Sequence, residues 1–489
     1  MMSSGKQTVV RTRFAPSPTG PMHMGTVRTV LFNYLFAKNR AGVFILRIED
    51  TDKERSLKEW EDDILENLQW LGLQWDEGPI TQTQNYIGSY GPYRQSERTE
   101  MYQKYLKQLL EQGRAYWCFC TQEELDAQRQ HQLSLGQAPK YTGTCRTLPS
   151  GKKDQYLNEG RSPVIRFAVE QKIIAFHDLI RGEIKFDTNL IGDIVIAKDL
   201  NTPLYNFTVV IDDFEMKITH VIRGEEHISN TPKQILLQEA FGFSRPTYAH
   251  VSLILAPDRT KLSKRHGDNS ITRFRKEGYL PEAIVNFLSL LGWNPGTERE
   301  IFSSDELIKE FSIERVQKNP AIFNIQRLDW LNGFYIRKKD LPQLTKLCIP
   351  YLTARGEGSA LEPIVALYQE RLKKLSEIAE LTDFFFQKNL AYPKELLYWK
   401  DASDADTKRM LDTLAQLLSS IGEGEWTKEK LAEIIMPQAE KQKNKGYMLW
   451  PFRVALTGKK ASAGPFEIAH VLGKEKTLQR IQEAVARLS

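Results

Sequence analysis

The sequence predicts a multidomain α/β protein with an open parallel nucleotide-binding sheet, an inserted α+β segment and a long helical C-terminal half. Three observations lead to this fold class. The first third reads as strand, loop, helix, strand and helix, the order of a parallel sheet with crossover helices. The pattern changes between about residues 93 and 199, and beyond about residue 281 it is helical almost throughout. A length of 489 residues suits three to five domains.

Composition excludes several other classes. With 41% hydrophobic and 26% charged residues, the chain is not mainly disordered, collagen-like or of low complexity. It has no apolar run of roughly 18 residues and no apolar leader at its start, so we expect neither a membrane helix nor a signal peptide. Four cysteines are too few for a disulfide framework and favour the reducing cytoplasm. The net charge of +5 permits a nucleic-acid partner without requiring one.

The first elements carry the sheet prediction. Val9–Phe14 is rich in β-formers and runs into a loop of helix-breaking residues at 15–21. A helix is expected next, because apolar residues recur at helical spacing from Val27 to Leu35. The apolar run at 43–48 is typical of a buried parallel strand, and a further helix follows around Trp60–Leu71.

The insertion and the return of the sheet follow from shorter patterns. Helices are expected around 100–112 and 122–132. Strands are expected at 164–169, 173–176 and 183–186 within the insertion, and the sheet pattern resumes at 204–211, 217–222 and 253–256.

The first phosphate-binding motif lies between the first strand and its helix. A helix that begins at the carboxyl end of a parallel strand offers free N–H groups to an anion. His23 can bond phosphate oxygens there, and Gly25 lets a ligand approach the backbone. His-x-Gly alone recurs by chance about once per 400 positions, so only its placement makes it informative.

The second motif is the basic loop at 261–267, with Lys261, Ser263 and Lys264. Such a run taken alone is usually a solvated turn. The functional interpretation is a clamp whose lysines stabilise charge as it develops on a leaving pyrophosphate. Lys-x-Ser-Lys has a chance expectation of roughly 0.06 in a chain of this length, and together the two motifs favour the clamp. No P-loop and no dinucleotide-binding glycine motif follows the relevant strands.

These residues resemble the class I aminoacyl-tRNA synthetases, and in detail the bacterial type of glutamyl-tRNA synthetase. His23–Thr26 is similar to the HIGH tetrad and Lys261–Arg265 to the KMSKS loop of that class. The resemblance covers nearly the whole chain and weakens between about 341 and 440. It also rests on the segments at 13–20, 46–52, 91–96, 221–227, 328–332 and 453–458. Met24, Thr26, Leu262 and Arg265 depart from the usual motifs, but the histidine, the glycine and both lysines are present.

The resemblance implies a Rossmann-like class I catalytic core followed by all-α anticodon-binding domains. The expected domains are the split core at 1–92 and 200–258, the acceptor-stem-binding insertion at 93–199, a stem-contact domain at 259–340, and two helical anticodon-binding domains at 341–395 and 396–489.

The implied reaction has two steps. The α-carboxylate of glutamate attacks the α-phosphorus of ATP, and the 2′-hydroxyl of the terminal tRNA adenosine then attacks the glutamyl-adenylate. The substrate is its own nucleophile, so catalysis consists of positioning and charge stabilisation. Members of this family usually need tRNA for the first step.

The implied catalytic residues are His23, Lys261 and Lys264. The implied ATP-binding residues are Pro16, Ser17, His23, Gly25, Lys261, Ser263 and Lys264, with Mg²⁺ bound through ATP. The implied glutamate-binding residues are Arg13, Ala15, Ser17, Glu49, Tyr205 and Arg223, with Glu49 on the α-ammonium and an arginine on the side-chain carboxylate.

Cys118, Cys120 and Cys145 are similar to a zinc knuckle found in some relatives. Thr stands at position 147, where relatives offer a fourth ligand, and Tyr141 is a poor substitute. Ordinary buried thiols are therefore the favoured interpretation and structural zinc the second.

The expected partners are tRNA(Glu), L-glutamate and ATP, and the expected state is a monomer. Glu362-Pro363 occupies the neighbourhood of an arginine that discriminates anticodons in some relatives, which leaves charging of tRNA(Gln) open. Three alternatives fit part of the sequence: a glutaminyl-tRNA synthetase, a non-catalytic tRNA-binding paralogue and a cytidylyltransferase. A helical C-terminal half disfavours the first, the retained histidine and lysines disfavour the second, and the length of the chain disfavours the third.

Overall fold

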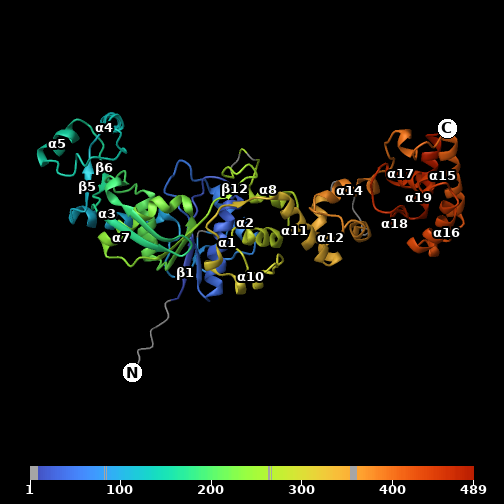
Figure 1. The fold of residues 1–489 in the computed structure, drawn as a ribbon, viewed down its shortest axis with the longest axis horizontal. Coiled ribbons are helices and arrows are strands. Elements are labelled where there is room, and N and C mark those ends of the chain that lie inside the picture. The colour runs from blue at the N-terminus through green and yellow to red at the C-terminus, as the bar shows by residue number, and fades with distance from the viewer. Residues whose placement is uncertain are drawn as a thin grey trace, which may run out of the picture. The chain divides into compact units, whose positions relative to one another are not determined.

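The computed structural model describes residues 9–81, 83, 85–262, 265, 267–352 and 361–488 (Figure 1). The chain divides into two compact units, Met1–Arg275 with Pro281–Ile325, and Lys276–Leu280 with Gln326–Ser489. Among the described residues, no helix is both long enough and apolar enough to cross a membrane.

The strands all lie in the first unit. They are β1 (Arg11–Phe14), β2 (Val43–Leu46), β3 (Gly78–Pro79), β4 (Tyr86–Ile87), β5 (Ala115–Cys118), β6 (Val164–Phe167), β7 (Ile173–Asp178), β8 (Gly182–Asp187), β9 (Ile194–Ala197), β10 (His220–Gly224), β11 (Thr247–Val251), β12 (Ile254–Leu255) and β13 (Ala321–Ile322).

The helices of the first unit are α1 (Met24–Asn39), α2 (Lys58–Trp70), α3 (Thr99–Glu111), α4 (Gln122–Ser134), α5 (Ser150–Asn158), α6 (Tyr205–Glu215), α7 (Thr231–Phe241), α8 (Ile271–Lys276), α9 (Pro281–Leu290) and α10 (Ser304–Glu310). From α11 onward the helices belong to the second unit. They are α11 (Ile325–Lys338), α12 (Leu341–Leu352), α13 (Leu361–Ala366), α14 (Glu377–Phe386), α15 (Asp404–Ser419), α16 (Lys428–Glu440), α17 (Gly446–Thr457), α18 (Pro465–Leu472) and α19 (Lys474–Ala486).

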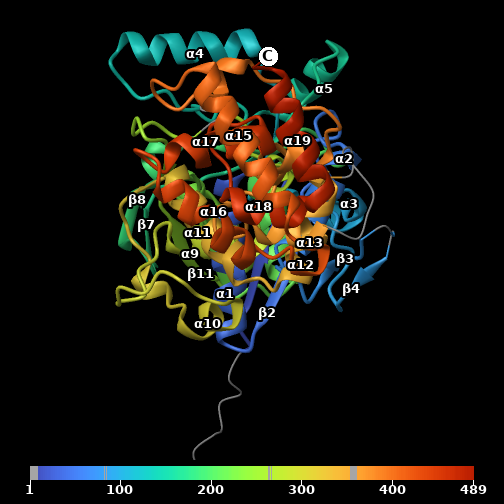
Figure 2. The same ribbon diagram turned by 90° about the vertical axis from the view of Figure 1, so that its right-hand side faces the viewer.

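Parallel pairing forms the core of the first unit. β1 pairs with β2 and β10 pairs with β11, in both cases in parallel. The N–H of Thr219 donates to the carbonyl of Arg11 at 3.0 Å, which brings β10 beside β1. β11 also pairs in parallel with β7, and β7 and β8 run antiparallel side by side (Figure 2). The predicted α/β core is thus confirmed, with a mixed edge made by β7 and β8 from the range expected to be inserted.

Helix α1 covers the junction of β1 and β10. The amide of Asn33 donates to the carbonyl of Ile222 at 2.9 Å, and the Thr12 hydroxyl donates to the carbonyl of Asn33 at 3.0 Å. These bonds satisfy polar groups inside an apolar interface, where an unpaired group would cost about 1–3 kcal/mol. The start of α1, with the first motif, is therefore fixed at the end of β1.

The strand expected at 204–211 is wrong, because these residues form the first part of α6. The run Val209–Ile211 favours a strand by propensity alone. The helix nevertheless forms because about two of its turns bury Phe207, Val210 and Ile211 together with Asp212 and Asp213, and arginines from other elements bind those carboxylates. Tertiary ion pairing therefore overrides the local preference.

The remainder of the insertion forms a separate sheet. β5, β6 and β9 pair antiparallel in that order, and Figure 1 shows β5 and β6 with α4 and α5 nearby. The second unit is helical, as the sequence predicts. Within the described ranges 326–352 and 361–488 there is no strand.

Candidate active site

A cavity of about 720 Å³ opens at the carboxyl ends of β1, β2 and β10. The ladder of β1 and β2 continues past their ends, because the N–H of Glu49 donates to the carbonyl of Pro16 at 2.8 Å. The cavity collects ten of the residues predicted from the sequence. These are Arg13, Ala15, Pro16, Ser17, His23, Gly25, Glu49, Tyr205, Arg223 and Lys261. The other two, Ser263 and Lys264, lie outside the described residues.

The chain that follows the second motif runs beside the first. The N–H of Met24 donates to the carbonyl of Asn269 at 3.2 Å, and the N–H of Ile271 donates to the carbonyl of Met22 at 2.9 Å. Asp63 of α2 joins both segments, since it accepts from the Met22 N–H at 2.8 Å and from the Thr272 hydroxyl at 2.6 Å. Two segments about 240 positions apart in the sequence thus border the same cavity.

His23 is the N-cap of α1. Its Nδ1 accepts a hydrogen bond from the N–H of Thr26 at 3.3 Å, and its backbone is extended, as an N-cap requires. The imidazole is exposed at the cavity, at the positive end of the helix dipole. His23 therefore combines a structural contact with a position suited to an anionic ligand.

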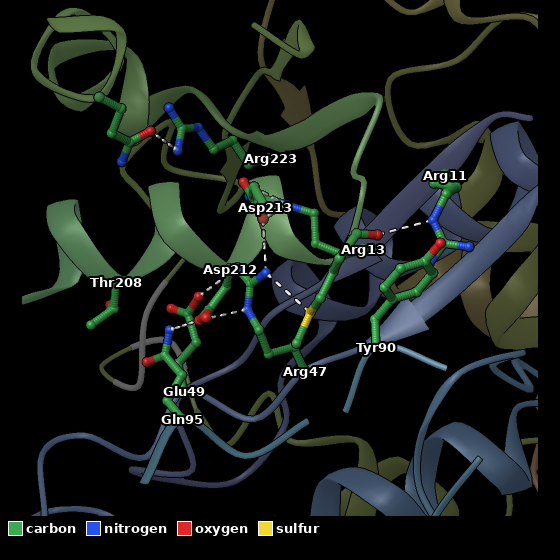
Figure 3. Close-up of polar contacts among 12 residues, drawn as sticks. Arg11, Arg13, Arg47, Glu49, Tyr90, Gln95, Thr208, Asp212, Asp213 and Arg223 are labelled. Atoms are coloured by element: carbon green, nitrogen blue, oxygen red, sulfur yellow. Dashed lines mark hydrogen bonds and ion pairs between the residues drawn. The ribbon is translucent and has the colours of Figure 1, made fainter. Parts of the chain in front are cut away.

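A cluster of buried charges lies behind the cavity (Figure 3). Arg47 is fully buried and pairs with Glu49 at 3.0 Å and with Asp213 at 2.8 Å. Asp213 also accepts from the Nε of Arg13 at 3.2 Å. Burial opposes ionisation of Asp213, but Arg13 and Arg47 outweigh it and lower the pKa of its carboxyl. The cluster therefore holds Arg13 and Glu49 in fixed positions.

The adjacent Asp212 binds residues at the start of the insertion. Its carboxylate accepts from Arg98 at 2.7 Å, from Gln95 at 2.7 Å and from the hydroxyl of Tyr102 at 2.9 Å. Burial strongly raises the pKa of Tyr102, so its hydroxyl stays a donor. Two neighbouring aspartates of α6 thus connect the cavity to the beginning of α3.

Glu49 is a buried carboxylate that lines the cavity. Burial raises the pKa of its carboxyl, and the Arg47 guanidinium opposes that rise. A second cation inside the cavity would stabilise the ionised form further. The site therefore suits a ligand with an ammonium group near Glu49.

Arg223 is a buried arginine whose hydrogen-bond partners among the described residues are all neutral. It is 5% exposed, and its Nε, Nη1 and Nη2 donate to His250 Nε2 at 3.2 Å, Gln234 at 2.9 Å and Thr231 at 2.8 Å. Within the described part of the chain, no carboxylate lies within 4.0 Å of this guanidinium. An arginine has five N–H groups, so two remain for a ligand. A buried charge without a counter-ion is costly, and an anion in the cavity would relieve it.

The sequence did not single out several residues of this site. Arg47, Asp212 and Asp213 form the buried charge cluster, and His227 lines the cavity with its Nδ1 3.2 Å from the Tyr205 hydroxyl. A signal existed for Arg47, since a lone arginine inside an apolar strand must be paired to be buried. His227 ends the segment 221–227 on which the family resemblance rests, but nothing else in the sequence assigns its side chain to the cavity.

The three cysteines named from the sequence lie together in the insertion. Their sulfur atoms are all within 4.8 Å of one another, and Cys120 and Cys145 are 3.6 Å apart. Tetrahedral zinc with thiolate bonds of about 2.3 Å separates its sulfurs by roughly 3.8 Å, so the three thiols fit zinc. The Tyr141 hydroxyl lies 3.4 Å from Cys118 and 3.5 Å from Cys120. Burial raises the pKa of the Cys120 thiol to about 12, which favours the protonated form while no metal is bound.

Comparison with known proteins agrees with this geometry. The family described as class I tRNA synthetases (E and Q), catalytic domain, matches residues 9–330, and an anticodon binding domain matches residues 343–485. The chain is 47% identical to the glutamate–tRNA ligase of Carboxydothermus hydrogenoformans, over 97% of this chain and 99% of the relative. It is 48% identical to glutamate–tRNA ligase 1 of Caldicellulosiruptor saccharolyticus, over 97% and 98%.

Solved structures are similar over the same length. The crystal structure of a glutamate tRNA ligase from Elizabethkingia meningosepticum in complex with its amino acid matches with a TM-score of 0.86 and 36% identity, over 98% of this chain and all of the other. Because the parallel core, the cavity and the helical second unit coincide with full-length similarity, the chain belongs to the class I tRNA synthetases of the E and Q family.

Proposed function

We propose that this chain is an ATP-dependent ligase that joins L-glutamate to the 3′-terminal adenosine of tRNA(Glu) through glutamyl-adenylate. The observation that carries the proposal is Arg223, a buried cation in the cavity that has only neutral partners among the described residues. A substrate with a carboxylate on its side chain supplies the missing anion. The names of the full-length relatives support the same substrate.

At the amino-acid end of the cavity, different residues bind the charged groups of glutamate. Arg223 receives the side-chain carboxylate through its two remaining N–H groups, as a bidentate pair. Glu49 receives the α-ammonium. Arg13 already pairs with Asp213, so it contributes donors without an excess charge. Ala15, Ser17 and Tyr205 complete this part of the wall.

The nucleotide end lies at the start of α1. His23 and Lys264 bind the phosphates of ATP, with Lys261 assisting; Lys264 lies outside the described residues. Pro16, Ser17, Gly25 and Ser263 provide the remaining ATP contacts, and Mg²⁺ enters bound to the triphosphate. Cations that approach the pyrophosphate as it leaves stabilise the transition state, and no protein nucleophile is required.

Different domains bind different parts of the tRNA. The insertion at 93–199 receives the acceptor stem, 259–340 contacts the stem, and 341–395 with 396–489 bind the anticodon. The anticodon-binding match at 343–485 supports the last assignment. Glu362 and Pro363 are exposed at the start of α13, and no arginine stands at either position to discriminate anticodons. We therefore extend the proposal to tRNA(Gln), which charging of the two purified tRNA pools tests.

Two further assignments have direct measurements. The thiol cluster could hold structural zinc, with Tyr141 as the fourth ligand. Metal analysis of the purified chain and of Cys145→Ser decides between zinc and three thiols without a metal. We also propose that the chain acts as a monomer, for which light scattering should give a mass near 56.4 kDa.

The test of the proposed function is exchange of labelled pyrophosphate into ATP. Exchange should require glutamate and tRNA together, and glutamine should not replace glutamate. Exchange with glutamine favours a glutaminyl-tRNA synthetase. Tight tRNA binding without any exchange favours a non-catalytic paralogue and contradicts the proposal.

A further inference from the structure

Three buried side chains lie in a row across the strands behind the amino-acid end of the cavity. They are Arg223 of β10, His250 of β11 and Asp178 of β7, with exposures of 5%, 0% and 0%. Arg223 and His250 are register partners in the parallel ladder, and β7 pairs with β11 on its other side. Of the three, Arg223 alone lines the cavity.

The hydrogen bonds of Asp178 fix where the imidazole carries its proton. One oxygen of Asp178 accepts from the backbone N–H groups of Ile180 at 2.9 Å and Arg181 at 2.8 Å. The other oxygen lies 2.6 Å from Nδ1 of His250. Burial would raise the pKa of Asp178, but His250 and those backbone donors outweigh it and lower that pKa. An ionised carboxylate accepts only, so Nδ1 of His250 must be the donor.

The other ring nitrogen therefore faces Arg223 as an acceptor. Nε2 of His250 receives the Nε–H of Arg223 at 3.2 Å, and the hydroxyl oxygen of Thr231 lies 3.1 Å from the same nitrogen. Burial lowers the pKa of His250 and outweighs the hydrogen bond to Asp178, which raises it, and the guanidinium of Arg223 adds to the lowering, so the neutral ring is favoured. A carboxylate in the place of this imidazole would also orient the guanidinium, but it would cancel its charge.

We propose that Asp178 and His250 are positioning residues for amino-acid selection, which hold Arg223 by a neutral acceptor so that its charge remains available to a substrate carboxylate. The inference rests on the proposed function and adds two residues that do not touch the substrate. It explains why, within the part of the chain that the structure describes, Arg223 is oriented by an imidazole, an amide and a hydroxyl and by no acid.

A purely structural role for His250 makes a different prediction. In that case its task is to hold Asp178 and the turn after β7, and its contact with Arg223 is incidental. Two substitutions separate the roles. His250→Asn places an amide near Nδ1, so it can still donate to Asp178 but leaves the Nε–H of Arg223 unpaired. His250→Gln places an amide near Nε2, so it can still accept from Arg223.

The experiment measures tRNA-dependent pyrophosphate exchange with glutamate and with glutamine for the wild type and both variants. His250→Asn should raise the KM for glutamate by about tenfold or more, with the KM for ATP little changed. This is the size of effect found when a residue that orients a ligand-binding side chain is removed. His250→Gln should keep more of the preference for glutamate. The reverse order, or two variants that match the wild type, overturns the inference.

A third variant, and a direct measurement of where the His250 ring is protonated in the wild type, provide tests that do not depend on whether the first two variants fold. Asp178→Asn retains an oxygen for the backbone N–H groups but presents an amide donor to Nδ1, which should move the ring proton to Nε2 and raise the KM for glutamate. Nitrogen NMR of the wild type should show neutral His250 protonated at Nδ1. A ring protonated at Nε2 or at both nitrogens contradicts the inference. If the wild type shows no glutamate-dependent exchange, the proposed function itself fails.

Discussion

At the residue scale, the arginines around the cavity differ in what balances their charge. Arg47 and Arg13 pair with buried carboxylates, whereas Arg223 has neutral partners among the described residues. A site built around an unbalanced cation should accept a carboxylate and reject its amide, because the amide leaves the cation unpaired in a dry pocket. We therefore predict that selectivity depends on Arg223 and on the groups that orient it.

Replacement of Arg223 tests this directly. Arg223→Gln removes the charge and keeps hydrogen-bonding groups, so kcat/KM for glutamate should fall by about 10³ or more while that for glutamine changes little. Exchange assays with both amino acids measure the two values. Arg245→Gln is the matched control, because Arg245 pairs with Glu239 at the surface. An equal loss for both amino acids in Arg223→Gln would remove Arg223 from the discrimination.

His227 gives a prediction about pH. Burial, with repulsion by Arg223, lowers the pKa of its imidazole to about 4, from about 6.5 in the unfolded chain. As the pH falls, His227 is protonated in the unfolded chain before it is protonated in the folded chain. The free energy of unfolding should therefore decrease as the pH falls from about 6.5 towards about 4. NMR of histidine-labelled protein, assigned with His227→Gln, should show no titration of His227 between pH 8 and 5.5. A midpoint near pH 6.5 would contradict this.

Residues that belong to short motifs could be identified from the sequence, whereas residues that contact the cavity only through another side chain could not. His23 and Lys261 stand in patterns with fixed spacing, and both line the cavity. Asp178 and His250 stand in ordinary strands, and only the register of β7, β10 and β11 brings them to Arg223. Such contacts depend on tertiary structure and leave no local signal.

At the scale of elements, the most informative helices are α1 and α6. The start of α1 was predictable, because a loop of helix breakers precedes a helical apolar pattern. The identity of α6 was not, because Val209–Ile211 favours a strand locally and the arginines that stabilise Asp212 and Asp213 come from distant segments. Elements whose stability is local can be read from sequence, and elements held by distant ion pairs cannot.

Two substitutions can separate the role of His23 as the N-cap of α1 from its proposed role in phosphate binding. Asn is among the best N-cap residues, so His23→Asn should keep the thermal stability of the first unit, whereas His23→Ala should lose about 1 kcal/mol. Both should lower the exchange rate by about 10² or more, because both remove the imidazole from the phosphates. Calorimetry and exchange measure the two effects. An Asn variant with near-wild-type exchange would reduce His23 to a helix cap.

At the scale of the whole molecule, the chain combines an α/β unit that contains the cavity with a helical unit. This division was predictable, since helical periodicity and proline punctuation dominate the second half of the sequence. The partition into five domains remains a prediction. So does the meeting of Lys264 with His23 across one ATP molecule, although residues 269 and 271 already pair with residues 24 and 22.

The most direct test of the account is a crystal structure with a non-hydrolysable analogue of glutamyl-adenylate. The side-chain carboxylate should lie on the two remaining N–H groups of Arg223, the α-ammonium on Glu49 and the phosphate beside His23, with Arg223 still bonded to Nε2 of His250. A side-chain carboxylate bound away from Arg223, or an analogue outside this cavity, would contradict the account.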